Sequence, residues 1–543
     1  MAENTSRAIE TEYPRITSDR IIEDVARSVL ISTYKDSPKL RKKAYEAYKK
    51  IFNSEISEGL FAKLDNNTLF LMGPPGNGKT SCVRAGCRKA AEAMGLNFTT
   101  SADLSREGRI PNENDFLFVV HNLAGEISPL TFTGLPTKKT VGDLEFTGSV
   151  PYKMYAEADY CIKQGGAAFV FFDDVGNAAS NIMTALYDIV NERSRNGQPV
   201  PACALASNYG KEDGNVSTYI NSALQNRVQM YHFDMRGEED KIIKRMENKI
   251  DRYRSAGAHP TALSYLTAVT AFFDSHKNYI VPDPKVGKDM EAMSTPRSIE
   301  KFMHEVLLDG CTVFAKDSDK SSNRVGHRSK GHDIMIEKLT KRAKGFCGNE
   351  VSFALTAFVE SYMDNVEPMI AKVFQGMTDE EYKEYQSIMS AKAHRGVSAE
   401  GLRLAIQIGY SAADHAANHL DESKGPEVFM ETFKEAFTLL AKCNAGVTNP
   451  HTIALSANRA FNMMARKYTK FTEYGAAFVT FDPARPEDKK YLFTNDSYMT
   501  LLSALKAGGI QSGEIMAMRG ELSGVASTAS ANASTDIVRP SMR

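Results

Sequence analysis

The sequence predicts an α/β fold with a buried, mainly parallel β-sheet, followed by helical domains. Short apolar runs rich in Val, Phe and Leu recur between residues 67 and 208, and helical or Gly-bearing stretches separate them. Runs of this kind are typical of parallel strands that helices cover on both faces. After about residue 234 the strand pattern gives way to helical patterns, and a chain of 543 residues exceeds one ordinary core. We therefore expect several domains.

Four apolar runs mark the expected strands. They are NTLFLM (67–72), DFLFVVHNL (115–123), AAFVFFDD (167–174) and VPACALASN (200–208). A helical stretch, SCVRAGCRKAAEAMG, follows the first run. The stretches EEDKIIKRMENKIDRYRSAG and TPRSIEKFMHEVLLDG then predict a helical second domain.

Residues 73–80, GPPGNGKT, match the phosphate-binding pattern G-x-x-x-x-G-K-[ST], with an apolar strand before them and a helix after them. The glycines let backbone N–H groups surround a phosphate, and the helix N-terminus adds partial positive charge. We expect Lys79 to reach the β- and γ-phosphates of ATP and the Thr80 hydroxyl to ligate Mg²⁺. The predicted nucleotide-binding residues are Gly73, Pro74, Pro75, Gly76, Asn77, Gly78, Lys79, Thr80 and Ser81.

The run FVFFDD (169–174) predicts a buried strand that ends in two carboxylates. Ligands bind at the carboxyl ends of the strands in parallel α/β sheets. We therefore expect Asp173 to ligate the Mg²⁺ that Thr80 holds, and Asp174 to orient the attacking water.

Residues 67 to about 297 resemble AAA+ ATPases of the MoxR group. The stretch FVFFDDVGNAASNIMTALYDIVNERSRNGQPVP resembles that group's Walker B strand and the helix after it. The stretch FVVHNLAGEISPLTFTGLP resembles the segment that leads into the group's helix-2 insert. The resemblance implies an α/β P-loop AAA+ core with a helical lid, ATP hydrolysis and assembly into a hexameric ring.

Three further residues acquire roles from this resemblance. Asn208 ends the strand run ALASN, where the family keeps a polar sensor-1 residue facing the γ-phosphate. Arg227, in SALQNRVQMYHF, matches the arginine finger that contacts ATP in the neighbouring subunit. Arg297, in STPRSIEKF, matches sensor 2 in the lid. A finger from a neighbour is physically sensible because it brings a cation to the transition state only on assembly.

One position departs from the family pattern. The family usually ends its Walker B strand with Asp-Glu, whereas this chain has Asp173 and Asp174. Aspartate is one methylene shorter, so the carboxylate that positions the water can lie too far back. Hydrolysis is therefore less strongly predicted than ATP binding.

The expected domain organisation follows from these patterns. It comprises an N-terminal helical arm (1–60), the α/β nucleotide-binding domain (61–234), a helical lid (235–315), a basic linker (316–345), a mainly α-helical C-terminal domain (346–518) and a disordered tail (519–543). The linker is polar, locally basic and Gly- and Ser-containing, and the tail is rich in Ser, Ala, Gly and Thr.

Composition and charge argue against several classes of protein. The formal charge of -1 gives no global attraction to nucleic acid or anionic lipid. No apolar run approaches the roughly 20 residues that span a bilayer, and MAENTSRAIETEYPR lacks the apolar segment of a signal peptide. The 7 cysteines are scattered without a CxxC pair, which predicts reduced, buried thiols. We expect a cytoplasmic protein, in the host cytoplasm if a phage encodes it.

The sequence leaves three possibilities for the role of ATP. The resemblance implies that residues 131–150 form an insert facing the ring's centre and that the ring remodels a protein partner, often one with a von Willebrand factor A-type domain. One alternative is a nucleic-acid motor or loader that binds phosphates through residues 316–345, although acidic residues interrupt that stretch. Another is an ATP-binding scaffold that does not hydrolyse, because of Asp174.

Overall fold

The computed structural model describes two compact units. The described residues are 14–126, 128–141, 144–195, 198–208, 222–281, 292, 294–315 and 330–375, together with 378, 380, 381, 383, 407, 410, 411, 414 and 415. Among them, the first unit comprises the residues up to Glu238, Val281 and Thr295–Arg297, and the second comprises the others. The predicted division into six segments is finer than these two units and stays a prediction.

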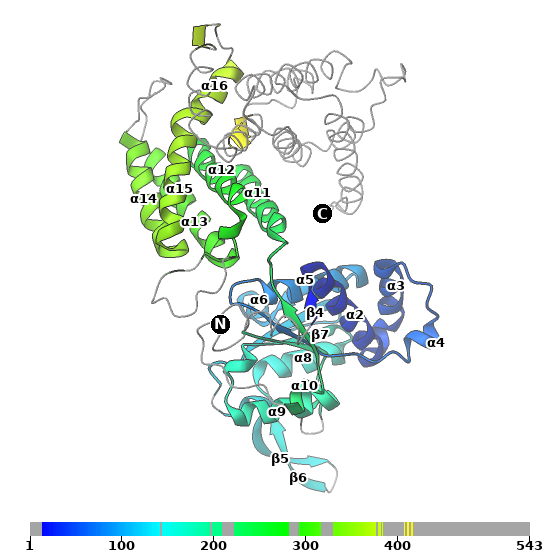
Figure 1. Cartoon of the computed structure of the whole chain (residues 1–543). Helices are drawn as coiled ribbons and strands as arrows, with labels where there is room; N and C mark the ends of the chain where they lie inside the picture. Colours follow the sequence, from blue (N-terminus) through cyan, green and yellow to red (C-terminus); the bar gives the residue numbers. More distant parts are fainter. Residues whose placement is uncertain are drawn as a thin grey trace, which may run out of the picture. The chain divides into compact units, whose positions relative to one another are not determined.

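A sheet of 7 parallel strands forms the centre of the first unit, which confirms the predicted fold class (Figure 1). Its order is β1 (Arg15–Ile16), β11 (Gln229–Phe233), β2 (Leu69–Met72), β10 (Cys203–Ser207), β7 (Ala167–Asp173), β4 (Asp115–Asn122) and β3 (Asn97–Thr100). The four predicted strands are β2, β4, β7 and β10. Because all strands are parallel, their carboxyl ends meet at one edge, where β10 lies between β2 and β7.

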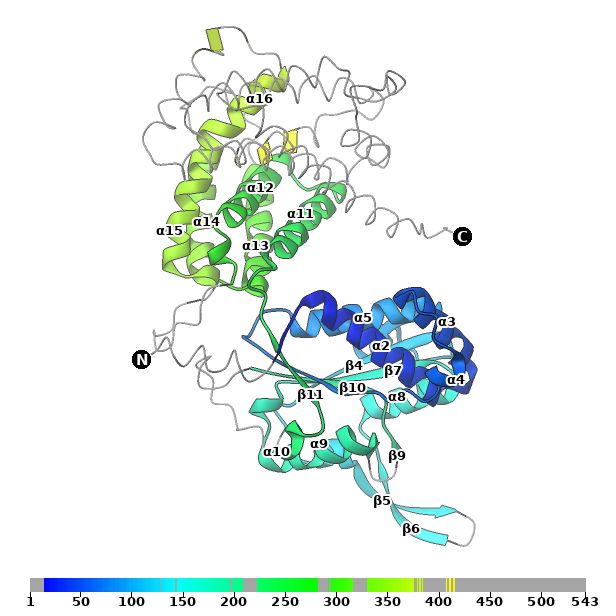
Figure 2. The same ribbon diagram turned by 45° about the vertical axis from the view of Figure 1, so that its right-hand side comes forward.

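Helices cover both faces of this sheet (Figures 1 and 2). One face carries α2 (Ser18–Asp36), α3 (Arg41–Phe52), α5 (Lys79–Met94) and, around them, η1 (Pro38–Leu40), α4 (Glu58–Phe61) and α6 (Ser101–Glu107). The other carries α8 (Lys153–Gln164), α9 (Ser180–Glu192) and α10 (Ser222–Gln225), with the short turns η2 (Val175–Asn177) and α7 (Leu130–Thr133) nearby.

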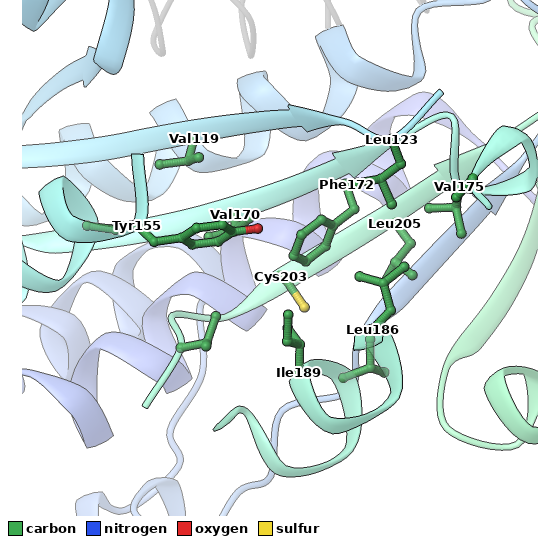
Figure 3. Packing of buried hydrophobic residues seen from close by; sticks show 14 of the residues in the cluster. Val119, Leu123, Tyr155, Val170, Phe172, Val175, Leu186, Ile189, Cys203 and Leu205 are labelled. Carbon is green, nitrogen blue, oxygen red and sulfur yellow. The ribbon is translucent and has the colours of Figure 1, made fainter. Parts of the chain in front are cut away.

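The core beneath the second face explains why β7 is apolar throughout. Alternate residues of a strand point to opposite faces, so Val170 and Phe172 face α8 and α9 while the residues between them face α5. Figure 3 shows Val170 and Phe172 beside Tyr155, Leu186 and other fully buried side chains of this cluster. Both faces of the strand are therefore dry, as predicted for a covered parallel sheet.

Residues 14–60, the described part of the predicted N-terminal helical arm (1–60), belong to the α/β unit. Arg15 and Ile16 extend the sheet by pairing with β11. Along α2, apolar side chains are buried against α5, and a β-carbon at Gly86 would lie only 2.8 Å from that of Val25. The amphipathic spacing of α2 and the small residue on α5 explain this close packing.

Within the described part of the α/β unit, two antiparallel hairpins project from the sheet. The longer pairs β5 (Leu135–Val141) with β6 (Leu144–Val150), and it stands away from the sheet in both views (Figures 1 and 2). The shorter pairs β8 (Ser194–Arg195) with β9 (Gln198–Pro199). The longer hairpin occupies the position of the predicted insert, residues 131–150.

The second unit is helical among its described residues. It contains α11 (Glu239–Ser255), α12 (Pro260–Ser275), η4 (Lys277–Tyr279), α13 (Pro296–Phe314), α14 (Lys330–Cys347), α15 (Asn349–Ser361), the π-helix η5 (Tyr362–Val366) and α16 (Glu367–Gln375). The first two residues of α13 belong to the α/β unit. No helix in the described ranges is long and apolar enough to cross a membrane.

The second half of the predicted linker, residues 330–345, lies in a helix. Residues 330–347 form α14, which buries Met335, Leu339, Ala343 and Cys347. These positions recur every four residues on one face of the helix, and the surrounding Lys and Arg residues hid that stripe. The first half of the linker, nearly all of the predicted C-terminal domain beyond residue 375, and the tail at 519–543 lie outside the described residues.

The described cysteines are free thiols, as expected from their scattered positions. Cys311 is half-buried, and the others are buried: Cys82, Cys87, Cys161, Cys203 and Cys347. Cys443 lies outside the described residues.

Candidate functional site

A glycine-rich loop joins the end of β2 to the start of α5. Gly73 packs so closely on β11 that a β-carbon there would lie 2.0 Å from the carbonyl oxygen of Phe233. Gly76 and Gly78 have φ angles of 82° and 89°, a left-handed conformation that favours glycine. Because α5 begins at Lys79, the loop's backbone N–H groups lie at a helix N-terminus, an arrangement that binds phosphate.

Lys79 holds this loop to the neighbouring strand end. Its Nζ donates to the carbonyl oxygens of Gly73 and Pro74 at 2.6 and 3.0 Å. It also donates to Oδ1 of Asn208, which follows β10, at 3.0 Å. Since Lys79 is only 7% exposed, its charged group is fixed beside the loop rather than extended into water.

The two residues predicted to ligate Mg²⁺ are in contact. Thr80 Oγ1 donates to Asp173 Oδ2 at 2.8 Å, which joins the first turn of α5 to the end of β7. A hydroxyl and a carboxylate are hard oxygen ligands of the kind Mg²⁺ prefers. The structure thus brings together the predicted P-loop and the predicted acidic strand end.

Asp174 lies one residue further in an unusual backbone conformation. Its φ and ψ are 56° and 39°, which places an L-residue in the left-handed region. Its two carboxylate oxygens accept from Nδ2 of Asn208 and Nδ2 of Asn122, each at 3.3 Å. Its backbone N–H donates to Asp173 Oδ1 at 3.1 Å. The left-handed turn therefore presents the carboxylate between two amides.

Asn122 is a site residue that the sequence analysis did not identify. It ends β4, level with Asp173 in the register of the sheet. Its own Oδ1 accepts the backbone N–H of Ala124 at 2.9 Å, which fixes the amide orientation. The signal was present in the sequence, because FVVHN ends an apolar run in Asn just as ALASN does at Asn208.

Ser207 ties three of these loops together. Its backbone carbonyl accepts the N–H of Gly73 at 3.2 Å. Its hydroxyl accepts the N–H of Gly176 at 3.1 Å and lies 2.9 Å from the carbonyl oxygen of Asn208, to which it donates. Ser207 is 1% exposed, so these bonds are shielded from water and keep the three strand ends at fixed spacing.

Arg297 lies at the start of α13, close in sequence to a residue that touches the P-loop. Thr295 packs against the loop, because a β-carbon at Gly76 would lie 2.8 Å from Thr295 Oγ1. Arg297 is exposed and lies in the first turn of the helix. The chain thus brings the predicted sensor-2 residue to the neighbourhood of the glycine-rich loop.

Arg227 lies at the opposite edge of the sheet. It precedes β11, whose first residue, Gln229, is level with Leu69 of β2. Gly73 follows Leu69 by four residues, which is roughly 13 Å along a strand, and Arg227 lies further back still. Its exposed guanidinium stacks over the ring of Tyr187 on α9, 5.7 Å from the centroid. Arg227 therefore does not converge with the other predicted site residues.

The residues at the carboxyl edge fit a phosphate group and a hard cation such as Mg²⁺. Asn77 is 3% exposed, and its Nδ2 has no hydrogen-bond partner among the described residues, which leaves a buried donor in the loop. Lys79 supplies positive charge, and Thr80 and Asp173 supply hard oxygen atoms beside it. Pro74, Pro75 and Ser81 complete the loop and the first turn of α5.

No family model and no curated protein sequence matches this chain. Among solved structures, the chain is similar to NtrX from Brucella abortus in complex with ADP, with 12% sequence identity and a TM-score of 0.26. The match covers 64% of this chain and 68% of NtrX. A TM-score this low supports no conclusion about function, which therefore has to be inferred from the geometry of the site.

Proposed function

We propose that the protein binds ATP and hydrolyses it with Mg²⁺ at the carboxyl edge of the sheet. The observation that carries this proposal is the convergence of a glycine-rich loop and a buried lysine after β2 with two successive aspartates at the end of β7, on the two sides of β10. Phosphoryl transfer needs mainly positioning and charge stabilisation, and these residue types supply both.

Each residue has a defined task in this proposal. The backbone N–H groups of the loop and Lys79 bind the phosphates, and Thr80 and Asp173 would hold Mg²⁺. Bound there, the metal would neutralise charge that develops on the phosphate oxygens. Asp174 orients the attacking water, and Asn208 keeps the carboxylate facing Lys79 because it contacts both residues.

ATP binding and turnover are tested separately. A fluorescent ATP analogue, titrated with and without Mg²⁺, measures binding, and phosphate release measures hydrolysis. Saturable binding with Mg²⁺-dependent release is the expected result. Binding without release favours the ATP-binding scaffold, which Asp174 motivates because its carboxylate is shorter than the usual glutamate. Absence of binding contradicts the proposal.

We further propose that the chain works as an AAA+ ring resembling the MoxR group, with Arg227 serving the nucleotide of a neighbouring copy. Arg227 lies at the edge of the sheet opposite its own P-loop, so any phosphate it reaches must belong to another chain. The hexamer that the resemblance implies is part of this proposal. Arg297 lies two residues after Thr295, which packs against the P-loop of the same chain. We therefore propose that Arg297 acts on the nucleotide of its own chain.

Mixed assemblies test this arrangement. Arg227→Ala subunits should bind ATP nearly normally yet hydrolyse it about 1000-fold more slowly. Mixing them with Lys79→Ala subunits should restore part of the activity, because some interfaces then combine an intact P-loop with an intact finger. Arg297→Ala subunits should not be rescued in this way. Sizing with ATP and tagged chains checks that subunits exchange; a monomer in which Arg227→Ala hydrolyses at the parental rate contradicts the ring.

The proposed work is the remodelling of a protein partner, in the manner of a chaperone. The β5–β6 hairpin supports this proposal, since Leu135 and Val150 face each other across its strands and are 56% and 52% exposed. A partner with a von Willebrand factor A-type domain is the candidate that the resemblance suggests. The nucleic-acid motor has less support because its predicted phosphate-binding stretch is partly the packed helix α14. Stimulation of turnover by single-stranded DNA would favour the motor instead.

A further inference from the structure

The β5–β6 hairpin is held at both ends by one side chain, that of His121. Helix α7 precedes the hairpin in the chain and helix α8 follows it. We call α7 the entering foot of the hairpin and α8 its leaving foot. His121 belongs to β4 and is 2% exposed. Its two ring nitrogens contact groups that lead to opposite feet, which makes a single imidazole the common anchor.

The contact to the leaving foot is direct. Nδ1 of His121 lies 2.8 Å from the hydroxyl of Tyr155, which is in the first turn of α8. Tyr155 is 1% exposed, and Figure 3 shows its ring beneath the strands beside Val119 and Val170. The first turn of α8 is therefore fixed to β4 by a bond that water does not reach.

The contact to the entering foot runs through a carboxylate. Nε2 of His121 lies 3.0 Å from Oε1 of Glu126, and Oε2 of Glu126 lies 2.8 Å from the hydroxyl of Thr131 in α7. A carboxylate only accepts, so Nε2 carries the hydrogen and Nδ1 accepts from Tyr155. Burial lowers the pKa of His121, although Glu126 raises it, so the neutral ring with this arrangement is the form at neutral pH.

The same strand end reaches the proposed catalytic edge. Asn122, the next residue, donates to Asp174, and the backbone N–H of Leu123 donates to the carbonyl oxygen of Asp173 at 2.9 Å. A change at the two aspartates therefore acts on the residues adjoining His121. No contact of the hairpin itself with the aspartates is needed for this connection.

We propose that His121 is a positioning residue that couples the catalytic edge to the β5–β6 hairpin by holding both of its feet. The nucleotide dependence of this coupling rests on the proposed function. The holding of the feet is independent of it and is measurable in protein without nucleotide.

Hydrogen exchange of the hairpin amides provides the readout, in protein without nucleotide, with ADP, and with a non-hydrolysable ATP analogue. In His121→Leu both bonds are lost, and exchange across residues 134–152 should be about tenfold faster than in the parent. The parental difference between ADP and the ATP analogue should disappear. A residue with a merely structural role would speed exchange yet leave that difference intact, which would overturn the proposal.

Single-contact variants separate the two feet. His121→Asn keeps an acceptor near Nδ1 for Tyr155, and His121→Gln keeps a donor near Nε2 for Glu126, so each should loosen only one strand of the hairpin. Tyr155→Phe should match His121→Gln, whereas Tyr160→Phe, an exposed tyrosine on the same helix, should match the parent. If His121→Leu does not fold, Tyr155→Phe and Thr131→Val give the same test.

Nucleotide binding measured on the same samples separates a failure of the proposed function from a failure of the coupling by His121. If the parent binds neither nucleotide, the proposed function fails while the holding of the feet is still decided by exchange without nucleotide. If the parent binds both and its hairpin exchanges equally in each state, the coupling by His121 is wrong and the ATP site stands.

Discussion

Polar side chains are arranged differently in the two units. In the α/β unit, Lys79 and Asn208 follow two strands and Asp173 ends a third, and their contacts join these strand ends at one edge of the sheet. In the helical unit, Asp309 of α13 accepts from Lys338 and Arg342 of α14 at 2.8 and 3.0 Å. The first set belongs to the proposed ligand site, whereas the second joins two helices. Substitutions should therefore change ligand binding in one unit and unfolding in the other.

The largest expected effect is that of Lys79→Ala. We expect ATP hydrolysis to fall about 1000-fold and tight binding to be lost, because a fixed cation beside the phosphates is removed. The protein should still fold, although the loss of three hydrogen bonds from Lys79 should lower the melting temperature without nucleotide. Lys338→Ala is the matched control from the helical unit and should leave hydrolysis unchanged. If folded Lys79→Ala protein hydrolyses ATP at the parental rate, Lys79 is no more important for hydrolysis than Lys338, and the proposed ATP site is wrong.

A smaller effect is expected from Asp174→Asn. The amide cannot orient and activate water as a carboxylate does, so turnover should fall about 100-fold while ATP remains bound. Asp174→Glu should keep or raise turnover, since its extra methylene gives the reach usual at this position. Single-turnover phosphate release with a parallel binding titration measures both. Equal rates in all three proteins would show that Asp174 does not position the water.

The smallest effect concerns the pH dependence of unfolding in the helical unit. Burial raises the pKa of Asp309, but hydrogen bonds from Arg342 and Lys338 outweigh it and lower that pKa below its ordinary value. A lowered pKa in the folded state stabilises above about pH 4 and is lost as the pH falls through the folded pKa. Asp309→Asn should therefore cost up to about 1 kcal/mol in urea unfolding at pH 6.

The same comparison at pH 3 checks the sign. The difference in unfolding free energy between parent and Asp309→Asn should shrink as the carboxylate becomes protonated. ATP binding at pH 7 should be equal in the two proteins. A difference that stays constant with pH would mean that the charge of Asp309 is not what the variant removes.

The sequence predicts the parts of the fold whose apolar pattern is strong. β2, β4, β7 and β10 are buried on both faces, so each is a continuous apolar run. β1 has only 2 residues, and β3 and β11 carry Asn, Thr, Gln and His, so pairing with neighbours rather than local pattern makes them strands. The helix α14 was not predicted because its buried stripe is narrow and charged residues surround it.

Site residues that belong to one continuous motif were predicted from the sequence. Site residues that come together only through strand pairing in the sheet were missed. The P-loop is one continuous motif, so Lys79 and Thr80 could be assigned from their spacing. Asn122 is 52 residues from Asp174 and becomes its neighbour only because β4 lies beside β7. His121 was missed because its contact with Tyr155, 34 residues further along the chain, depends on α8 packing against the sheet.

The left-handed backbone of Asp174 has a consequence for how this protein can be engineered. An L-residue there costs about 1 kcal/mol relative to glycine, and the contacts of its carboxylate offset part of that cost. Selection for thermal resistance alone would thus favour Gly or Asn at position 174 and would discard the carboxylate. Any library screened only for heat tolerance should hold this codon constant, because a more stable variant there would lack the carboxylate proposed to position the water.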